Sequence, residues 1–352
     1  MNQILVTGGA GFIGSHFVEA LMSAGHEVLV LDNLSTGSPD NLPRQARLEA
    51  IPLESDQAMA LLRTFRPESI FHFAAQVDVR VSTSKPVYDA QQNIINSLRL
   101  LEAGLQYGLG YFAFASSGGA IYGEPMAGPQ DEHHPERPLS PYGVAKLSVD
   151  KYLASFTHCR GLKSCSMRFS NVYGPRQNGR GETGVVAVLV RKALGGLPLR
   201  VNGDGNQTRD FIYVKDLARA ASLILGHRPQ GVLNFGTGVE TSIRHLVDLV
   251  RSEFPGNLEI QRFPGIPEEQ RRSVLDSTKA KQVLGWVPAT PLADGLKATI
   301  QWFSNSESSA PSDILRPGPS GVPGGGEHGD RRRLRILAGG ARGPGQANGS
   351  GK

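Results

Sequence analysis

Three glycines near the start of the chain constrain its fold most strongly. Gly8, Gly11 and Gly14 follow an apolar run, Ile4 to Val6, and precede a segment whose apolar residues recur at helical spacing. Glycines at a strand-to-helix turn let the backbone approach a pyrophosphate, and the helix N-terminus supplies N–H groups and partial positive charge. The sequence therefore predicts a strand–turn–helix unit that binds a dinucleotide.

An acidic residue at the end of the next apolar run supports this prediction. Asp32 comes eighteen residues after Gly14, where dinucleotide-binding folds place a carboxylate against the adenosine ribose hydroxyls. A carboxylate there would repel the 2′-phosphate of NADP, so we predict NAD as the cofactor. The residues expected to bind it are Gly8, Gly11, Phe12, Ile13, Gly14, Asp32, Asn33, Ser35, Thr36, Gly37, Phe73, Ala74, Ala75 and Gln76, together with Tyr142 and Lys146.

Apolar runs and helical patterns alternate along the first half of the chain, which predicts an α/β fold with a doubly wound parallel (Rossmann) sheet. Residues 1–170 are expected to form the NAD-binding domain. Residues 171–303 have shorter elements, and we expect them to form a smaller α/β substrate-binding lobe, partly interleaved with the first domain. The expected elements include strands at 47–54, 69–73, 111–115 and 232–235, the last of them in the lobe, and one long helix at 88–106.

The basic charge is concentrated in the last part of the chain. The net charge is +5, and residues 304–352 carry seven Lys or Arg against four Asp or Glu. This Gly-, Pro- and Arg-rich tail has little apolar periodicity, so we expect it to be disordered. The remainder is close to neutral, which argues against a nucleic-acid partner, and no apolar stretch is long enough to span a membrane.

The sequence has two cysteines and shows no pattern of metal ligands. Cys159 and Cys165 have neither a metal-ligand spacing nor a disulfide framework, and we interpret them as free thiols of a cytoplasmic protein. His133 and His134 lie in a Pro-bounded loop without a third ligand, so no metal site is expected. His72 lies in an apolar strand and is interpreted as a core residue.

The residues after the strand expected at 111–115 indicate a catalytic site. Tyr142 and Lys146 are four residues apart, so they share one face of a helix. An ammonium beside a phenol favours the phenolate and lowers the tyrosine pKa toward neutrality, which makes it a usable general base. A Tyr-x-x-x-Lys pattern is common on surface helices. Its position after a dinucleotide fold and a serine-rich strand end favours catalysis by Tyr142 and Lys146.

These motifs together resemble the extended short-chain dehydrogenase/reductases, in particular the UDP-glucose 4-epimerase branch of the NAD-dependent epimerase/dehydratase family. The resemblance runs from Met1 to about Phe303. It implies that Tyr142, aided by Lys146 and the nicotinamide charge, removes the proton of a sugar 4-hydroxyl. Hydride then passes to NAD and returns to the other face of a 4-keto sugar.

The resemblance also assigns the substrate, a UDP-hexose, to particular residues. Asn171 would orient the sugar or a phosphate, and the backbone around Val201 would contact the base. Arg209 would bind the diphosphate, whose oxygens suit a guanidinium, and Ser117 would contact the sugar. A homodimer is implied through the helices near 88–106 and 141–158.

Several positions depart from the family pattern. Gly118 stands where many epimerases have a third hydroxyl residue, which usually shuttles the proton. Ser117 is expected to take that role; otherwise water takes it or Tyr142 acts alone. Gly119 and Ala120 replace the acids of the related dehydratases and decarboxylases, which argues against elimination of water. Ile266 stands at the place of a diphosphate arginine; the candidates to compensate are Arg262, Arg271 and Arg272. The usual adenine-facing aspartate is also absent, with Glu54 and Asp56 as candidates.

Ser273 aligns with the position that gates the sugar N-acetyl group in this family. A serine leaves room there, so the N-acetylated pair UDP-GlcNAc and UDP-GalNAc is expected to be accepted beside UDP-glucose and UDP-galactose. Two alternatives stay open: an epimerase of another nucleotide sugar such as UDP-glucuronate, and a non-catalytic protein that binds NAD and nucleotide sugar. The presence of both Tyr142 and Lys146 favours an enzyme.

Overall fold

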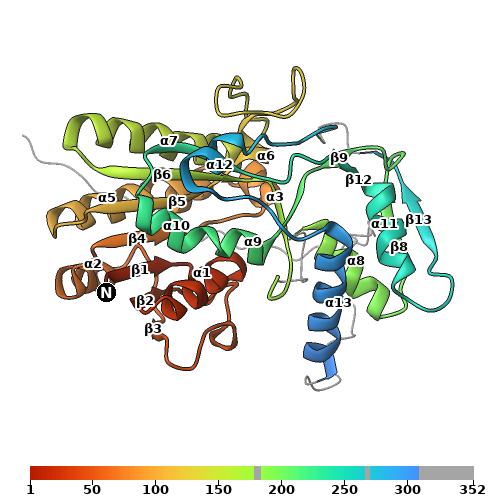
Figure 1. Ribbon diagram of the computed structural model, residues 1–352, viewed down its shortest axis with the longest axis horizontal. Coiled ribbons are helices and arrows are strands. Elements are labelled where there is room, and N and C mark those ends of the chain that lie inside the picture. Colours follow the sequence, from red (N-terminus) through yellow and green to blue (C-terminus); the bar gives the residue numbers. More distant parts are fainter. Residues whose placement is uncertain (178–183, 266–269, 309–352) are drawn as a thin grey trace, which may run out of the picture. The chain divides into compact units, whose positions relative to one another are not determined.

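A seven-stranded sheet forms the centre of the protein (Figure 1). The structure, a computed structural model, describes residues 1–177, 184–265 and 270–308. The strand order is β11-β6-β5-β4-β1-β2-β3, and every neighbouring pair is parallel, which confirms the predicted doubly wound sheet. Its strands are β1 (Gln3–Thr7), β2 (Glu27–Leu31), β3 (Arg47–Glu49), β4 (Ser69–His72), β5 (Tyr111–Ser117), β6 (Lys163–Phe169) and β11 (Gly231–Phe235).

Alternate side chains of the strands supply two cores, one on each face of the sheet. Ile4 and Val6 of β1 pack in one core, with apolar residues of α1 (Phe12–Ser23), α9 (Val214–Ala218), α10 (Ala220–His227) and α12 (Thr278–Leu284). Leu5 points to the opposite core, which includes residues of α2 (Asp56–Phe65), α5 (Asn96–Gln106) and α7 (Pro141–Arg160). Both faces are therefore covered by helices, as a parallel sheet requires.

Shorter elements form a third core around α8 (Val185–Leu194), α11 (Ile243–Ser252) and α13 (Leu292–Ser308). Three two-stranded sheets accompany these helices: β7 pairs with β10, β9 with β12, and β8 with β13. Helix α13 continues five residues beyond the boundary predicted at 303. The strands are β7 (Asn171–Tyr173), β8 (Leu199–Asn202), β9 (Thr208–Arg209), β10 (Phe211–Tyr213), β12 (Thr241–Ser242) and β13 (Ile260–Phe263).

The strand expected at 232–235 is present as β11, but its assignment to the smaller lobe is wrong. It pairs in parallel with β6 and closes the edge of the main sheet. Phe235 packs against Trp286, with ring centroids 4.9 Å apart, within the core on the α1 face. The chain thus returns from the lobe to the main sheet because these large apolar side chains complete that core.

The long helix expected at 88–106 is interrupted. It consists of α4 (Pro86–Ala90), a π-helical turn η2 (Gln91–Ile95) and α5. Within η2, Asn93 Nδ2 donates to the Gln76 carbonyl (2.9 Å) and to Asp89 Oδ1 (3.0 Å), and its Oδ1 accepts from the Gln76 N–H (2.8 Å). The wide turn directs the Asn93 amide toward the backbone of Gln76. π-Helical turns of this kind recur at functional sites.

The third strand is shorter than the expected 47–54. It ends at Glu49, and Pro52, which has no N–H to donate, follows three residues later. Ser55 then caps α2 by accepting a hydrogen bond from the Ala58 N–H (3.2 Å). Across the described part of the chain, no helix combines the length and the apolar character needed to cross a membrane.

Candidate active site

The glycine turn after β1 lies directly against the loop that follows β4. A Cβ added to Gly8 would lie 2.5 Å from the Ala74 nitrogen, and Gly8 has φ +67°. A Cβ on Gly14 would lie 2.3 Å from the Gly8 oxygen. Helix α1 then begins, and the N–H groups of Phe12 and Ile13 have no acceptor inside the helix. The turn is therefore a cradle that a pyrophosphate fits and a side chain would fill.

Asp32 lies at the carboxyl end of β2 and is fixed by backbone N–H groups. Its Oδ2 accepts from Ala10 (3.0 Å) and its Oδ1 from Leu34 (2.8 Å). A carboxylate can accept further hydrogen bonds, so ribose hydroxyls fit beside it. The sequence prediction missed Asn41, whose Nδ2 donates to the Ala10 carbonyl (2.9 Å). A Cβ on Gly37 would lie 2.9 Å from that same carbonyl.

The rest of the predicted cofactor loops lie at this carboxyl edge. Asn33 Oδ1 accepts from the Ser35 N–H (3.0 Å), which shapes the turn containing Thr36. Phe73 lies between β4 and Ala75 and packs on the core near Phe17, with ring centroids 4.7 Å apart.

Gln76 has its side chain engaged within the protein. Its Nε2 donates to Asp89 Oδ1 (2.8 Å) and to the Asp78 carbonyl (3.0 Å), so the side chain holds the loop in place. At the end of β4, His72 Nδ1 lies 2.5 Å from Thr7 Oγ1, and its Nε2 lies 2.8 Å from Ser97 Oγ. This confirms His72 as a core residue with both ring nitrogens paired.

Within the described part of the chain, no short hydrogen bond is donated to the carboxylate of either candidate for the missing adenine-facing aspartate. The Glu54 carbonyl, which is a backbone group, accepts from Arg99 Nη1 (2.8 Å). The Asp56 carboxylate is exposed and lies 3.9 Å from Arg99.

Helix α7 brings the predicted catalytic pair together. Ser140 caps it by accepting from the Gly143 N–H (3.2 Å), and Pro141 occupies the first turn. Lys146 is buried, and its Nζ donates to the Ala115 carbonyl of β5 (2.8 Å). The same Nζ lies 5.7 Å from the centroid of the Tyr142 ring. The ammonium thus lies over the aromatic face of the tyrosine.

We expected Lys146 to lower the pKa of Tyr142 toward neutrality. With only the charges that the protein itself supplies, this expectation is wrong. Burial, and then the nearby Asp89 carboxylate, raise the pKa of Tyr142 above its ordinary value. Burial lowers the pKa of Lys146 to about 8, against the opposing effect of Asp150 and Asp89. Deprotonation of Tyr142 therefore needs a further positive charge, which a bound NAD⁺ nicotinamide would supply.

The strand end before α6 (Gly118–Ile121) explains the missing hydroxyl. Ser117 Oγ accepts from the Ala120 N–H (3.3 Å), and as an acceptor the hydroxyl keeps its own proton for donation. A Cβ on Gly118 would lie 2.6 Å from Leu275 Cδ1. The Leu275 side chain occupies the space where the third hydroxyl residue would stand.

Three residues from distant parts of the sequence converge beside this loop. A Cβ on Gly119 would lie 3.5 Å from Ser273 Oγ and 3.8 Å from Asn171 Oδ1. Ser273 is fully buried, and its Oγ has no hydrogen-bond partner within the described residues. The small residue at 119 thus leaves two polar atoms, Ser273 Oγ and Asn171 Oδ1, close to the start of α6 and to Ser117. These groups fit a sugar, whose hydroxyls need such partners.

Arg209 and Val201 lie on separate strands of the smaller sheets, β9 and β8. Arg209 Nη1 donates to the Thr208 carbonyl (2.8 Å), and Val201 is buried. The sequence prediction missed Asp210, which is buried and whose Oδ2 accepts from the Leu275 N–H (3.2 Å). Its own carbonyl accepts from the Asn171 N–H (2.9 Å). Asp210 thereby connects the strand of Arg209 to Asn171 and to Leu275.

The proposed replacements for the missing diphosphate arginine differ in their contacts. Arg271 pairs with Asp204 (3.2 Å), and Arg272 pairs with Glu240. Arg262 lies on the exposed strand β13. Ile266 lies outside the described residues, as does the tail from 309. Among the described residues, no group of histidines, cysteines and carboxylates could hold a metal ion.

Comparisons with known proteins agree with this geometry. The model of the NAD dependent epimerase/dehydratase family matches residues 4–236. The chain belongs to this family. A UDP-glucose 4-epimerase of Mycolicibacterium smegmatis is 39% identical over 309 residues, covering 86% of this chain and 99% of the relative.

Two crystal structures of epimerases resemble this fold closely. A UDP-glucose 4-epimerase of Thermotoga maritima with UDP-glucose is 43% identical, with TM-score 0.83. A UDP-glucose 4-epimerase of Thermus thermophilus in complex with NAD is 41% identical, with TM-score 0.82. Each comparison covers 86% of this chain and 99% of the other. The family resemblance inferred from the motifs is thus confirmed.

Proposed function

We propose that the protein is an isomerase that interconverts the C4 epimers of a UDP-hexose, UDP-glucose and UDP-galactose, with NAD as cofactor. The observation that carries this proposal is the convergence of Gly119, Ser273 and Asn171 beside Ser117. The same fold and a 43% identical sequence occur in an epimerase that holds UDP-glucose.

Different residues bind the cofactor, move the proton and bind the substrate in the proposed reaction. The glycine turn and Asp32 hold NAD, which supplies a reversible hydride acceptor when bound. Tyr142 takes the proton of the sugar 4-hydroxyl as the C4–H bond breaks, and returns it to the oxygen of the 4-keto sugar as that bond re-forms. Lys146 stabilises the phenolate, and Ser117 donates to the same oxygen. Asn171 orients the sugar, while Arg209 and the Val201 backbone bind the UDP part.

Product analysis tests this proposal. Purified protein is incubated, with and without added NAD, with UDP-galactose, UDP-GalNAc or UDP-glucuronate, and the products are separated by chromatography. Conversion of UDP-galactose to UDP-glucose supports the proposal. Turnover of UDP-glucuronate alone would replace it with the alternative substrate, and the absence of turnover with all three would favour a non-catalytic binding protein.

The small side chain of Ser273, beside Gly119, supports acceptance of the N-acetylated pair. We predict that Ser273→Tyr lowers kcat/KM for UDP-GalNAc by about 100-fold, because a phenol there fills the space for the acetamido group. The value for UDP-galactose should stay within about threefold, since this sugar has only a hydroxyl at C2. Ser273→Ala is the matched control and should retain both activities. Equal losses for both sugars in Ser273→Tyr would contradict this account.

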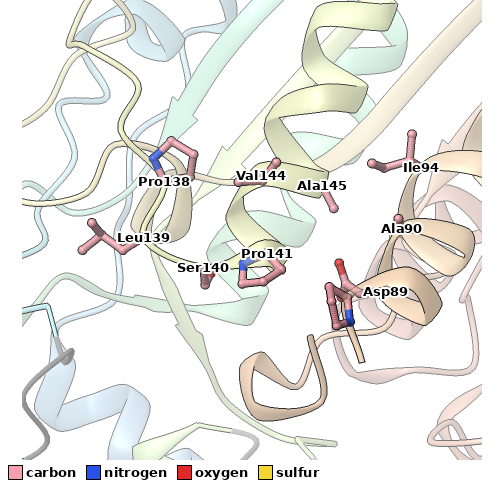
Figure 2. A pocket seen from close by; sticks show the side chains of 10 residues that line it. Asp89, Ala90, Ile94, Pro138, Leu139, Ser140, Pro141, Val144 and Ala145 are labelled. Atoms are coloured by element: carbon pink, nitrogen blue, oxygen red, sulfur yellow. The ribbon is translucent and has the colours of Figure 1, made fainter. Parts of the chain in front are cut away.

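We further propose that a second copy of the chain covers the face formed by α4, η2 and α7. This face exposes Val87 (83%) and Val144 (49%), together with Tyr88, Leu139, Ile95 and Tyr152. A hollow of about 440 Å³ lies between α4–η2 and the start of α7. Figure 2 shows the side chains that line it, most of which are apolar. A two-fold axis across such a face places two helices of each copy in one contact.

A charge on this face tests the proposed homodimer. Val144→Asp should convert a dimer to a monomer in light scattering, because it would bury unpaired carboxylates at the two-fold contact. Leu197→Asp is the matched control, since Leu197 is comparably exposed (52%) but lies between α8 and β8. A monomeric wild-type protein would contradict the proposal.

The free thiol of Cys159, which is exposed, supports a proposed cytoplasmic location.

A further inference from the structure

Buried charges lie behind the proposed catalytic pair. Asp150 follows Lys146 by one turn on the same face of α7. Arg168 of β6 donates from Nε to Asp150 Oδ2 (2.9 Å) and from Nη2 to Glu136 Oε1 (2.6 Å). Asp150, Arg168 and Lys146 are all buried, and none of the proposed steps uses the first two. A buried ion pair does not by itself indicate stability, so its place beside Lys146 needs another explanation.

Two polar contacts fix α7 on the sheet. Lys146 Nζ bonds to the Ala115 carbonyl on β5, and Asp150 bonds to Arg168 on β6. In the pairing of these strands, Ala115 lies opposite Met167 and Ser116 opposite Arg168. The two contacts are thus one helical turn apart on α7 and close together on neighbouring strands. Rotation of α7 about its axis would break both.

The surroundings of the Lys146 ammonium contain few compensating charges. It bonds to a neutral carbonyl and lies over the rings of Phe114 and Tyr142. Asp150 on α7 and Asp89 on α4 are the carboxylates that raise the pKa of Lys146 against burial.

The remaining titratable groups of this region do not add a negative charge beside Lys146. From β4, His72 is held neutral, because burial and then Lys146 lower its pKa to about 3. Glu136 forms ion pairs with both Arg168 and Lys151 and is part-exposed. Asp150 is therefore the carboxylate on the face of α7 that carries Lys146.

We propose that Asp150 is a positioning residue for the epimerase reaction: held by Arg168, it fixes the direction of Lys146 and keeps its ammonium charged beside Tyr142. The inference rests on the proposed function for its consequence in catalysis. Its electrostatic part concerns Lys146 alone, so a measurement without substrate can test it.

The direct test is titration of Lys146 by NMR in protein labelled at lysine Cε, with the signal assigned by Lys146→Arg. In Asp150→Asn the midpoint should fall by about one pH unit, the size expected for loss of one nearby charge. Glu136→Gln is the matched control: it removes the other carboxylate on Arg168 and should leave the midpoint in place. An unchanged midpoint in folded Asp150→Asn would overturn the proposal, whatever the activity.

The pH profile of kcat adds a catalytic readout. The pKa values of this profile belong to the Tyr142–Lys146 pair as a unit. In Asp150→Asn the alkaline limb should shift to lower pH, and in Asp150→Glu it should return to the wild-type pH. If Asp150→Asn does not fold, Asp150→Asn/Arg168→Met removes both charges of this ion pair, so Arg168 is not left unpaired, and it should still lower the Lys146 midpoint. An unmoved midpoint there would also overturn the proposal. A lowered midpoint in a protein without epimerase activity would contradict the proposed function alone.

Discussion

Replacement of Tyr142 by phenylalanine is expected to lower kcat for UDP-galactose by about 1,000-fold or more. The substitution removes the oxygen that accepts and returns the proton of the 4-hydroxyl, and it keeps the ring that lies beneath the Lys146 ammonium. Fold and NAD content should be unchanged. Turnover is measured by chromatography of UDP-sugars, and bound NAD by the nucleotide released on denaturation.

The matched control for this substitution is Tyr122→Phe. Tyr122 is buried and donates from its hydroxyl to Asn234 Oδ1 (2.8 Å), in a structural network. Its replacement should lower the free energy of unfolding by about 1–2 kcal/mol and leave kcat within a few-fold. A Tyr142→Phe protein that keeps wild-type turnover would refute the assignment of the base, and loss of its fold would assign the hydroxyl a structural role.

Gly8→Ala should lower NAD affinity by at least about 100-fold, which corresponds to about 2.7 kcal/mol. The added Cβ would lie 2.5 Å from the Ala74 nitrogen in a backbone conformation that disfavours side chains. Relief of this clash must separate the glycine turn from the loop at Phe73 and Ala74. We also expect the free energy of unfolding to fall by about 2–4 kcal/mol. Denaturant titration and NAD titration measure the two effects.

Gly25→Ala separates backbone strain from the clash. Gly25 has φ +81°, similar to Gly8, and a Cβ there would meet no atom within 4 Å. Its replacement should therefore cost about 1–2 kcal/mol of stability and leave NAD affinity unchanged. Equal effects of the two substitutions on NAD binding would show that Gly8 has no special place in the cofactor site.

Local patterns in the sequence predicted the parts of the fold that depend on local spacing. Gly8, Gly14 and Asp32 occur at fixed distances around one strand–turn–helix unit, and Tyr142 and Lys146 share a helical face whatever surrounds them. The π-helical turn around Asn93 could not be predicted in this way, because a helical periodicity does not show where one residue is added to a turn.

The remaining features depend on contacts between distant segments. The β11–β6 pairing joins parts of the chain that are more than sixty residues apart, and no local pattern indicates it. The raised pKa of Tyr142 follows from burial and from Asp89 across α4, which the Tyr-x-x-x-Lys spacing does not reveal. Asp210 was missed for the same reason, since its role lies in contacts with Thr237, Gly238 and Leu275.

The most direct test of the proposed reaction uses UDP-galactose carrying deuterium at C4, with the product followed by NMR. Transfer of the C4 hydrogen within one closed site predicts UDP-glucose that retains the deuterium at C4. Product that has exchanged deuterium for solvent hydrogen would contradict hydride transfer through a 4-keto sugar. Failure to form any UDP-glucose, with NAD supplied, would contradict the proposed function itself.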